Sequence, residues 1–140
     1  MTPEKQTQAL HDIRRSLEGR DTVEVLLIED DPFDAEIVKE RLSNYRINVT
    51  WSKTAEEALE LLRQGYDFII LLDLKSNCGM TGLDFLKRLK VTGARRKIIV
   101  LTGAYIEDSE ECKEALRLGA LAILLKPLTR EKIEMIFGRL

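Results

Sequence analysis

The chain has 140 residues, 44% of them hydrophobic and 33% charged, and its 22 basic and 24 acidic residues leave a formal net charge of −2. This size and composition fit one globular domain and are typical of neither a disordered nor a membrane-spanning chain. The near-neutral charge gives no general attraction to nucleic acid or to a membrane surface, and one histidine with two cysteines excludes a His/Cys zinc cluster and a disulfide framework.

Residues 1–21 are predicted to form a helical extension, followed by one domain at residues 22–140. Leu10, Ile13 and Leu17 recur at helical spacing and make a narrow apolar stripe. We interpret this stripe as the contact face of an extra helix that rests on the domain, and the alternative is a dimerisation helix. The segment has no apolar stretch of signal-peptide or transmembrane length, so we expect a cytoplasmic protein with reduced thiols.

From residue 22 onward, short apolar runs alternate with amphipathic stretches. Near-continuous apolar runs are typical of strands that are buried on both faces of a parallel sheet. We expect strands at 23–28, 47–51, 68–72, 98–101 and 121–125, and helices at 33–45, 54–64, 83–91, 108–118 and 129–137. Because right-handed crossovers join successive parallel strands, the alternation predicts an α/β fold, a doubly wound five-stranded parallel sheet in a three-layer αβα sandwich.

Polar side chains stand at the ends of four of these strands. They are Glu29, Asp30 and Asp31 after the first strand, Asp73 after the third, Thr102 at the end of the fourth and Lys126 after the fifth. Sites in open α/β sheets form at the carboxyl ends of the strands, so we expect these side chains to lie together. Taken singly, each has an ordinary alternative: Asp30 and Asp31 would serve as a helix N-cap, and Asp73 as a turn former.

The chemistry of such a group is restrictive. Several carboxylates within a few ångströms cannot all stay ionised unless a cation binds or a proton is held. A set of oxygen ligands favours Mg²⁺ (or Mn²⁺), with a phosphate oxygen often completing the shell. One carboxylate can then attack a phosphoryl group and become an acyl phosphate, while Lys126 and Thr102 offer a cation and a hydroxyl to the transferring oxygens.

Five segments carry a family resemblance. They are Leu-Leu-Ile-Glu29-Asp30-Asp31-Pro, Ile-Leu-Leu-Asp73-Leu, Gly82-Leu83, Ile-Val-Leu-Thr102-Gly-Ala, and Gly119-Ala leading into Lys126-Pro. Together they resemble the receiver domains of two-component response regulators, over roughly residues 22–138. The resemblance implies a flavodoxin-like fold with strand order 2-1-3-4-5. It also implies a signalling phosphoacceptor, not an enzyme with a separate substrate, that catalyses its own phosphorylation and slow dephosphorylation.

The resemblance also implies a role for each site residue. Asp73 would accept the phosphoryl group, and Asp73, Glu29 and Asp30 would bind the metal, with the main-chain carbonyl of Lys75 as a further ligand. Asp31 would be a supporting acid, and Thr102 and Lys126 match the phosphate-contacting hydroxyl and the switch lysine. The only histidine, His11, lies in the extension, so we expect the donor on a sensor histidine kinase or a phosphotransfer protein.

Two features depart from the family pattern. The loop after Asp73 lacks the usual proline and reaches Gly82 one residue late, and its Cys78 is expected to be exposed but unreactive. Ile123 stands where receivers usually carry Tyr or Phe, and Leu121 replaces a commonly polar residue. We therefore predict that switching uses backbone rearrangement after the fourth strand, and that Leu121 and Ile123 form an apolar switch or output surface.

Several alternatives stay open at this point. One is a pseudo-receiver, which docks proteins without being phosphorylated. A flavin carrier or a dehalogenase-type phosphatase is disfavoured, because contiguous acids would repel a flavin phosphate and do not form an Asp-x-Asp motif. A homodimer would use either the N-terminal helix or the face made by 108–118, 121–125 and 129–137. The basic segment 87–97 is interpreted as a solvated helix face and not as a nucleic-acid site. The chain is either a single receiver that acts through protein contacts or a piece of a longer regulator.

Overall fold

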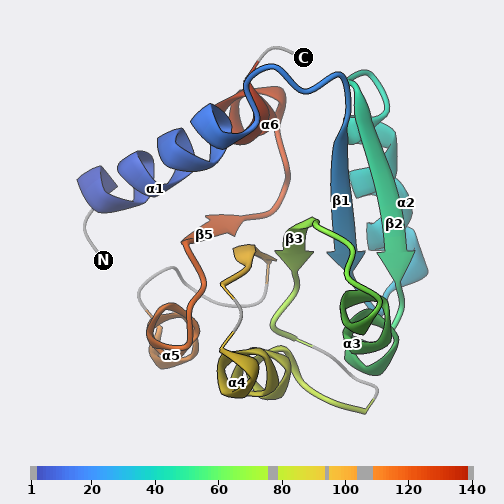
Figure 1. The fold of residues 1–140 in the computed structure, drawn as a ribbon, viewed down its shortest axis with the longest axis vertical. Helices are drawn as coiled ribbons and strands as arrows, with labels where there is room; N and C mark the ends of the chain where they lie inside the picture. The colour runs from blue at the N-terminus through green and yellow to red at the C-terminus, as the bar shows by residue number, and fades with distance from the viewer. Residues whose placement is uncertain (1–2, 76–78, 94, 104–108, 139–140) are drawn as a thin grey trace.

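The computed structural model describes residues 3–75, 79–93, 95–103 and 109–138. The strands are β1 (Val23–Ile28), β2 (Ile47–Ser52), β3 (Ile69–Leu72), β4 (Lys97–Thr102) and β5 (Ala122–Leu125). The helices are α1 (Pro3–Ser16), α2 (Pro32–Leu42), α3 (Ala55–Arg63), α4 (Gly82–Thr92), α5 (Glu110–Arg117) and α6 (Arg130–Phe137). All strand pairs are parallel, in the order β2-β1-β3-β4-β5 (Figure 1). The predicted fold and strand order are therefore confirmed.

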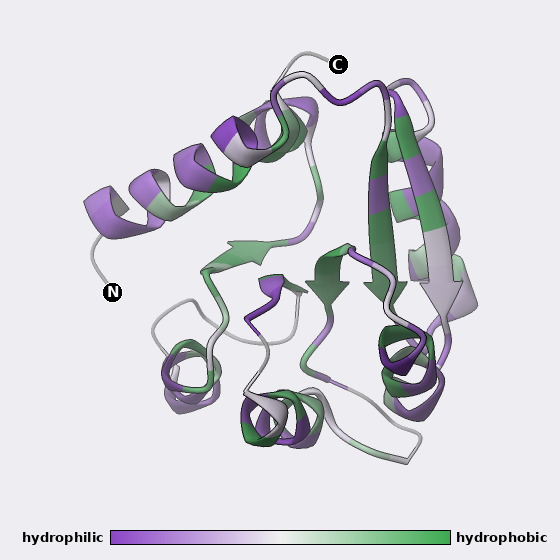
Figure 2. Cartoon of the chain, viewed as in Figure 1, coloured by the Kyte–Doolittle hydropathy of each residue, from purple (hydrophilic) through white to green (hydrophobic). Residues whose placement is uncertain are grey.

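The sheet has a hydrophobic core on each face, because successive residues of a strand point to opposite sides. In β1, Val25 and Leu27 pack with α1, α2 and α6, whereas Leu26 and Ile28 pack with α3, α4 and α5. Figure 2 shows hydrophobic residues along the inner strands and on the sides of the helices that face the sheet. Covering both faces explains why the strands read as continuous apolar runs in the sequence.

Side-chain caps fix where the helices begin. The Thr54 hydroxyl accepts a hydrogen bond from the Glu57 N–H at 3.2 Å, and the Glu57 carboxylate reaches back to the Lys53 N–H at 3.3 Å. This confirms the predicted start of α3. The largest boundary difference is at the end of α2, which stops at Leu42, because the Ser43 side chain and backbone both bond the Glu40 carbonyl and turn the chain.

α1 packs on α6 and β5 of the same chain (Figure 1). Leu10, Ile13 and Leu17 are buried in the core that also contains Phe137. The Gln6 side chain accepts a hydrogen bond from the Ile123 N–H of β5 at 3.0 Å. The N-terminal helix thus rests on the domain through its apolar stripe, as interpreted from the sequence.

The predicted output surface is wrong at Ile123. This side chain is 2% exposed and belongs to the core beneath α5, where Cys112 also lies. Leu121 is only partly exposed and packs against the opposite core. The two residues therefore form no shared exposed surface. Cys78 lies outside the described residues.

Among the described residues, none of the helices has the length and apolar character that a membrane span requires.

Candidate functional site

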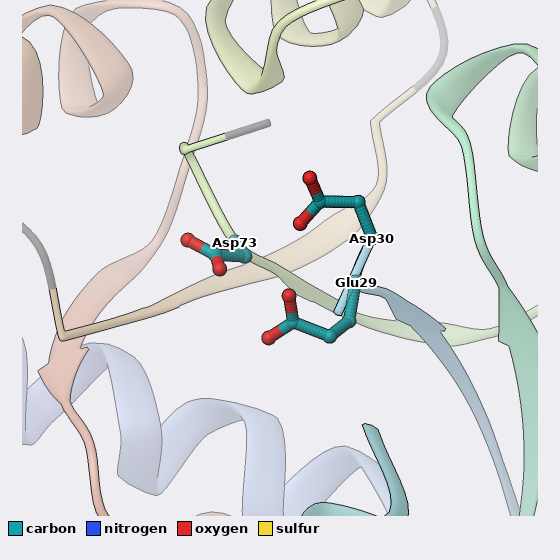
Figure 3. A group of neighbouring side chains, drawn as sticks. All are labelled: Glu29, Asp30 and Asp73. Carbon is teal, nitrogen blue, oxygen red and sulfur yellow. The ribbon is translucent and has the colours of Figure 1, made fainter. Parts of the chain in front are cut away.

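The ends of β1 and β3 bring three predicted acids together. The strands are neighbours, and the Asp73 N–H donates to the Ile28 carbonyl at 3.1 Å, which continues the pairing past β3. Glu29 and Asp30 follow β1 at the same edge. One carboxylate oxygen from each of Glu29, Asp30 and Asp73 lies within 4.8 Å of the others. Figure 3 shows these side chains gathered beyond the strand ends.

Lys126 joins this group as a cation. Its Nζ lies 2.5 Å from Glu29 Oε1, 3.2 Å from Asp73 Oδ2 and 3.3 Å from Asp34 Oδ2. Its backbone N–H donates to the Thr102 carbonyl at 2.9 Å, so the end of β5 stays tied to the end of β4. One ammonium group therefore contacts three carboxylates.

Burial dominates the electrostatics of the cluster. Desolvation raises the pKa of Glu29 to about 7, and the Asp73 charge adds to this rise, while the hydrogen bond from Lys126 opposes it. Burial also disfavours the charged form of Lys126, but the Glu29 hydrogen bond and the charges of Asp73, Glu29 and Asp34 raise its pKa above the ordinary value. Four carboxylates, those of Glu29, Asp30, Asp34 and Asp73, gather around the Lys126 ammonium, and Lys53 and Lys75 also line the cavity. The close approach of several carboxylates favours a bound cation.

Asp73 is oriented from both sides. Its Oδ1 accepts the Lys75 N–H at 3.1 Å, and its Oδ2 accepts from Lys126. The side chain is 12% exposed. The carboxylate is therefore held in place while part of it remains open to solvent.

The donor set fits Mg²⁺. Glu29, Asp30 and Asp73 supply only oxygen ligands, which suit a hard divalent cation. Together with Lys75 and Met80 they line a cavity of about 10 Å³, roughly the space of one water-sized sphere. Such a cavity suits a small ion and not an organic cofactor.

The remaining predicted residues differ in burial and in their hydrogen-bond partners. Asp31 is exposed and caps α2 through the Phe33 N–H at 2.9 Å, as in the helix-cap alternative, while its own N–H donates to Glu29 at 3.3 Å. Thr102 is fully buried at the end of β4, and Lys75 is exposed just after Asp73. His11 lies on α1, where it accepts from Arg14 at 2.7 Å, and it is not part of the cluster.

Three residues near the site were not predicted. The only available signal for Asp34 was the run of acids from Glu29 onward. Trp51 donates its indole N–H to the Glu29 carbonyl at 2.8 Å, and Glu56 accepts the Met80 N–H at 2.8 Å. These two contacts join segments far apart in the chain and leave no local pattern in the sequence.

A family model described as response regulator receiver domain matches residues 25–137. The chain is 29% identical over 114 residues to the transcriptional regulatory protein ZraR of Escherichia coli (strain K12), covering 81% of this chain and 25% of the relative. It is 35% identical over 103 residues to the transcriptional regulatory protein QseB of Escherichia coli O157:H7, covering 74% of this chain and 46% of the relative. The chain thus spans less than half the length of these two relatives.

The fold is also similar to that of the Vibrio cholerae chemotaxis protein CheY4. The TM-score is 0.67 at 24% identity, with 80% of this chain and 92% of that chain covered. At this identity the likeness establishes the shared fold alone.

Proposed function

Because the chain belongs to the response regulator receiver domain family of two-component signalling, we propose that it accepts a phosphoryl group on Asp73 and thereby changes its protein contacts. The observation that supports this is the position of Asp73, partly exposed, held by Lys126 and Lys75, and next to two further acids. The family works with kinases or phosphotransfer proteins, and His11 on α1 is remote from the cluster. The donor in this proposal is therefore a phosphohistidine on a sensor histidine kinase or a phosphotransfer protein.

Glu29, Asp30 and Asp73 would hold Mg²⁺ or Mn²⁺ in this proposal, with the main-chain carbonyl of Lys75 as a further ligand. When bound, the cation supplies positive charge that offsets the carboxylates and the oxygens of the incoming phosphoryl group. Asp31 supports this arrangement through its backbone N–H, which bonds Glu29.

In the transfer, a carboxylate oxygen of Asp73 forms a bond to phosphorus while the bond from phosphorus to the donor histidine nitrogen breaks. The nitrogen leaves with its electron pair. Lys126 is close enough to Asp73 to hydrogen-bond an oxygen of the transferred group, and the Thr102 hydroxyl at the end of β4 is the second donor. The acyl phosphate adds roughly −1.5 to −2 charge to an already acidic site, so the strand-end loops must adjust.

Backbone contacts offer a route for this adjustment. The Thr102 carbonyl accepts the Lys126 N–H, and the Leu125 carbonyl accepts from Lys132 of α6. A shift of Thr102 or Lys126 toward the phosphoryl group would therefore move the end of β5 and the start of α6. This route needs no aromatic side chain at Ile123. It runs through β5 and α6, whereas the rearrangement predicted from the sequence lies after β4.

The test is incubation with acetyl phosphate, or with a phosphorylated sensor kinase, with and without Mg²⁺, followed by intact mass measurement. The wild type should gain one acid-labile phosphoryl group only when Mg²⁺ is present, and Asp73→Asn should gain none. Asp67→Asn is a matched control, because Asp67 is exposed and forms an ion pair with Arg20. Labelling that persists in Asp73→Asn, or that needs no divalent metal, contradicts the mechanism. An unlabelled wild type supports the pseudo-receiver alternative.

A further inference from the structure

A side chain of α3 reaches the loop that follows Asp73. Glu56 lies in the first turn of α3, and its Oε1 accepts the N–H of Met80 at 2.8 Å. Met80 in turn lines the small cavity of the candidate metal site, together with Asp73 and Lys75. The contact therefore lies at the edge of the candidate metal site.

Gly79 leaves room for the same carboxylate. A Cβ at this position would lie 2.9 Å from Glu56 Oε1, closer than real Cβ atoms approach. Its φ of +64° is also a conformation that favours glycine. Two successive loop residues, Gly79 and Met80, are thus shaped to receive the Glu56 carboxylate.

Among the described residues, this loop is also held by backbone N–H hydrogen bonds near its two ends. The Lys75 N–H bonds the Asp73 carboxylate, and the Gly82 N–H bonds the Leu74 carbonyl at 3.3 Å. Between described residues, Glu56 is the one side chain from another element that hydrogen-bonds the loop backbone. Without the Glu56 contact, the hydrogen bonds that remain between described residues lie near the two ends of the loop, at Lys75 and at Gly82 of α4.

The charge of Glu56 suits this role. The hydrogen bond from the Met80 N–H lowers the pKa of Glu56 below its ordinary value, and its own backbone N–H and the Thr54 hydroxyl act in the same direction. A carboxylate in the first turn is also favoured by the helix dipole. Glu56 is therefore ionised at neutral pH, and hydrogen bonds to charged acceptors are among the stronger ones.

We propose that Glu56 is a positioning residue for the candidate metal site. By holding Gly79 and Met80 against α3, it fixes Met80 at the edge of the cavity that Asp73 and Lys75 also line, where a divalent cation would bind. This inference rests on the proposed function, because the position of Met80 beside the cavity matters only if a cation binds there. Loss of the contact would lower the fraction of molecules in which the site is arranged to bind Mg²⁺. The apparent Mg²⁺ affinity would fall in proportion to that fraction.

The chain contains its own reporter for the test. Trp51 is the only tryptophan, and its indole N–H bonds the Glu29 carbonyl next to the site. Mg²⁺ titration of the unphosphorylated protein can therefore be followed by Trp51 fluorescence, with the Mg²⁺-dependent rise in Tm as a second readout. Amide hydrogen exchange at Met80 without metal reports on the Glu56 contact itself.

Three variants separate the hydrogen bond from the charge. Glu56→Ala should raise the half-saturating Mg²⁺ concentration about fivefold, the effect of one lost hydrogen bond of ordinary strength, and should speed exchange at Met80. Glu56→Gln keeps an acceptor oxygen and should stay within about twofold of wild type. Glu60→Ala removes the same charge from the same helix, where Glu60 pairs with the exposed Arg63. This variant should change neither Mg²⁺ binding nor exchange at Met80.

Each other result overturns the proposal. Equal Mg²⁺ binding by Glu56→Ala and wild type would show that the contact does not position the site. A Glu56→Gln variant as weak as Glu56→Ala, or an equal loss in Glu60→Ala, would assign the effect to charge instead. If the wild type is labelled on Asp73 but Glu56→Ala binds Mg²⁺ as well as the wild type does, this inference alone is refuted. If the wild type is not labelled, the proposed function is refuted.

Discussion

Replacing Lys126 by methionine removes the ammonium that contacts Glu29, Asp34 and Asp73. Methionine keeps most of the apolar stem, so the change is mainly electrostatic. Burial and neighbouring groups already raise the pKa of Glu29 from 4.5 to about 7 with Lys126 present, equivalent to about 3 kcal/mol against the ionised form. Breaking a buried ion pair costs about 3–5 kcal/mol. Because the Lys126 side chain is 20% exposed, we expect the lower end, about 3 kcal/mol near pH 8.

The loss should depend on pH with a definite sign. A carboxyl whose pKa is higher in the folded state binds its proton more tightly there, so its unfavourable effect grows as pH rises from 4.5 through about 7. In Lys126→Met the pH range over which Glu29 lowers stability extends to higher pH, because the ammonium that favoured ionised Glu29 is gone. At about pH 5 Glu29 is protonated in both proteins, and the difference in unfolding free energy should shrink to about 1 kcal/mol.

Urea unfolding of wild type and Lys126→Met, near both pH values and with or without millimolar Mg²⁺, measures these differences. Lys113→Met is the control, because Lys113 forms an exposed pair with Glu110 at 3.6 Å that is worth less than about 0.5 kcal/mol. Mg²⁺ should restore much of the lost stability near neutral and higher pH, since it supplies the missing positive charge. An equal loss at both pH values, or no recovery with Mg²⁺, would refute the electrostatic reasoning.

Two further predictions concern the same edge of the sheet. Gly82→Ala should destabilise the protein by about 1–3 kcal/mol in urea unfolding, because a Cβ there would lie 2.7 Å from the Leu74 Cα; a variant as stable as wild type would show that the loop yields at no cost. The half-saturating Mg²⁺ concentration in Trp51 fluorescence should fall as pH rises through about 7, because Glu29 must lose its proton to bind metal. Glu29→Gln should lose this pH dependence, and its persistence would assign the titration to another group.

The fold and the acidic cluster were predictable because both depend on local patterns. Apolar runs located the strands, and residues that follow neighbouring parallel strands must lie at one edge of the sheet. This suffices to bring Glu29, Asp30 and Asp73 together. The strand order came from the family resemblance, since periodicity alone does not distinguish one doubly wound order from another.

The missed residues depend on how elements pack. Asp34 faces Lys126 because Ala35 and Val38 turn α2 onto the sheet, and this rotation is set by tertiary contacts. The error at Ile123 has a similar cause. Ile123 lies beside Val100 of β4, and both residues point into the core with α5. Successive residues of a strand face opposite sides of the sheet, so exposure depends on which side a position faces. The comparison of Ile123 with the Tyr or Phe of other receivers gave no information about that side.

The position of α1 connects the two homodimer alternatives. α1 lies on α6 and β5, two of the three elements of the second face, so a second copy that approached α6 and β5 from this side would meet α1 first. Exposing the face beneath it would release the Ile123 N–H from Gln6 and uncover Leu10, Ile13 and Leu17. Each of these side chains contributes about 1.5–3 kcal/mol when fully buried, which is large against the total stability of a domain this size. A dimer through this side therefore either includes the outer face of α1 or exchanges α1 for an equivalent helix, and removing residues 1–21 should change its affinity in both cases.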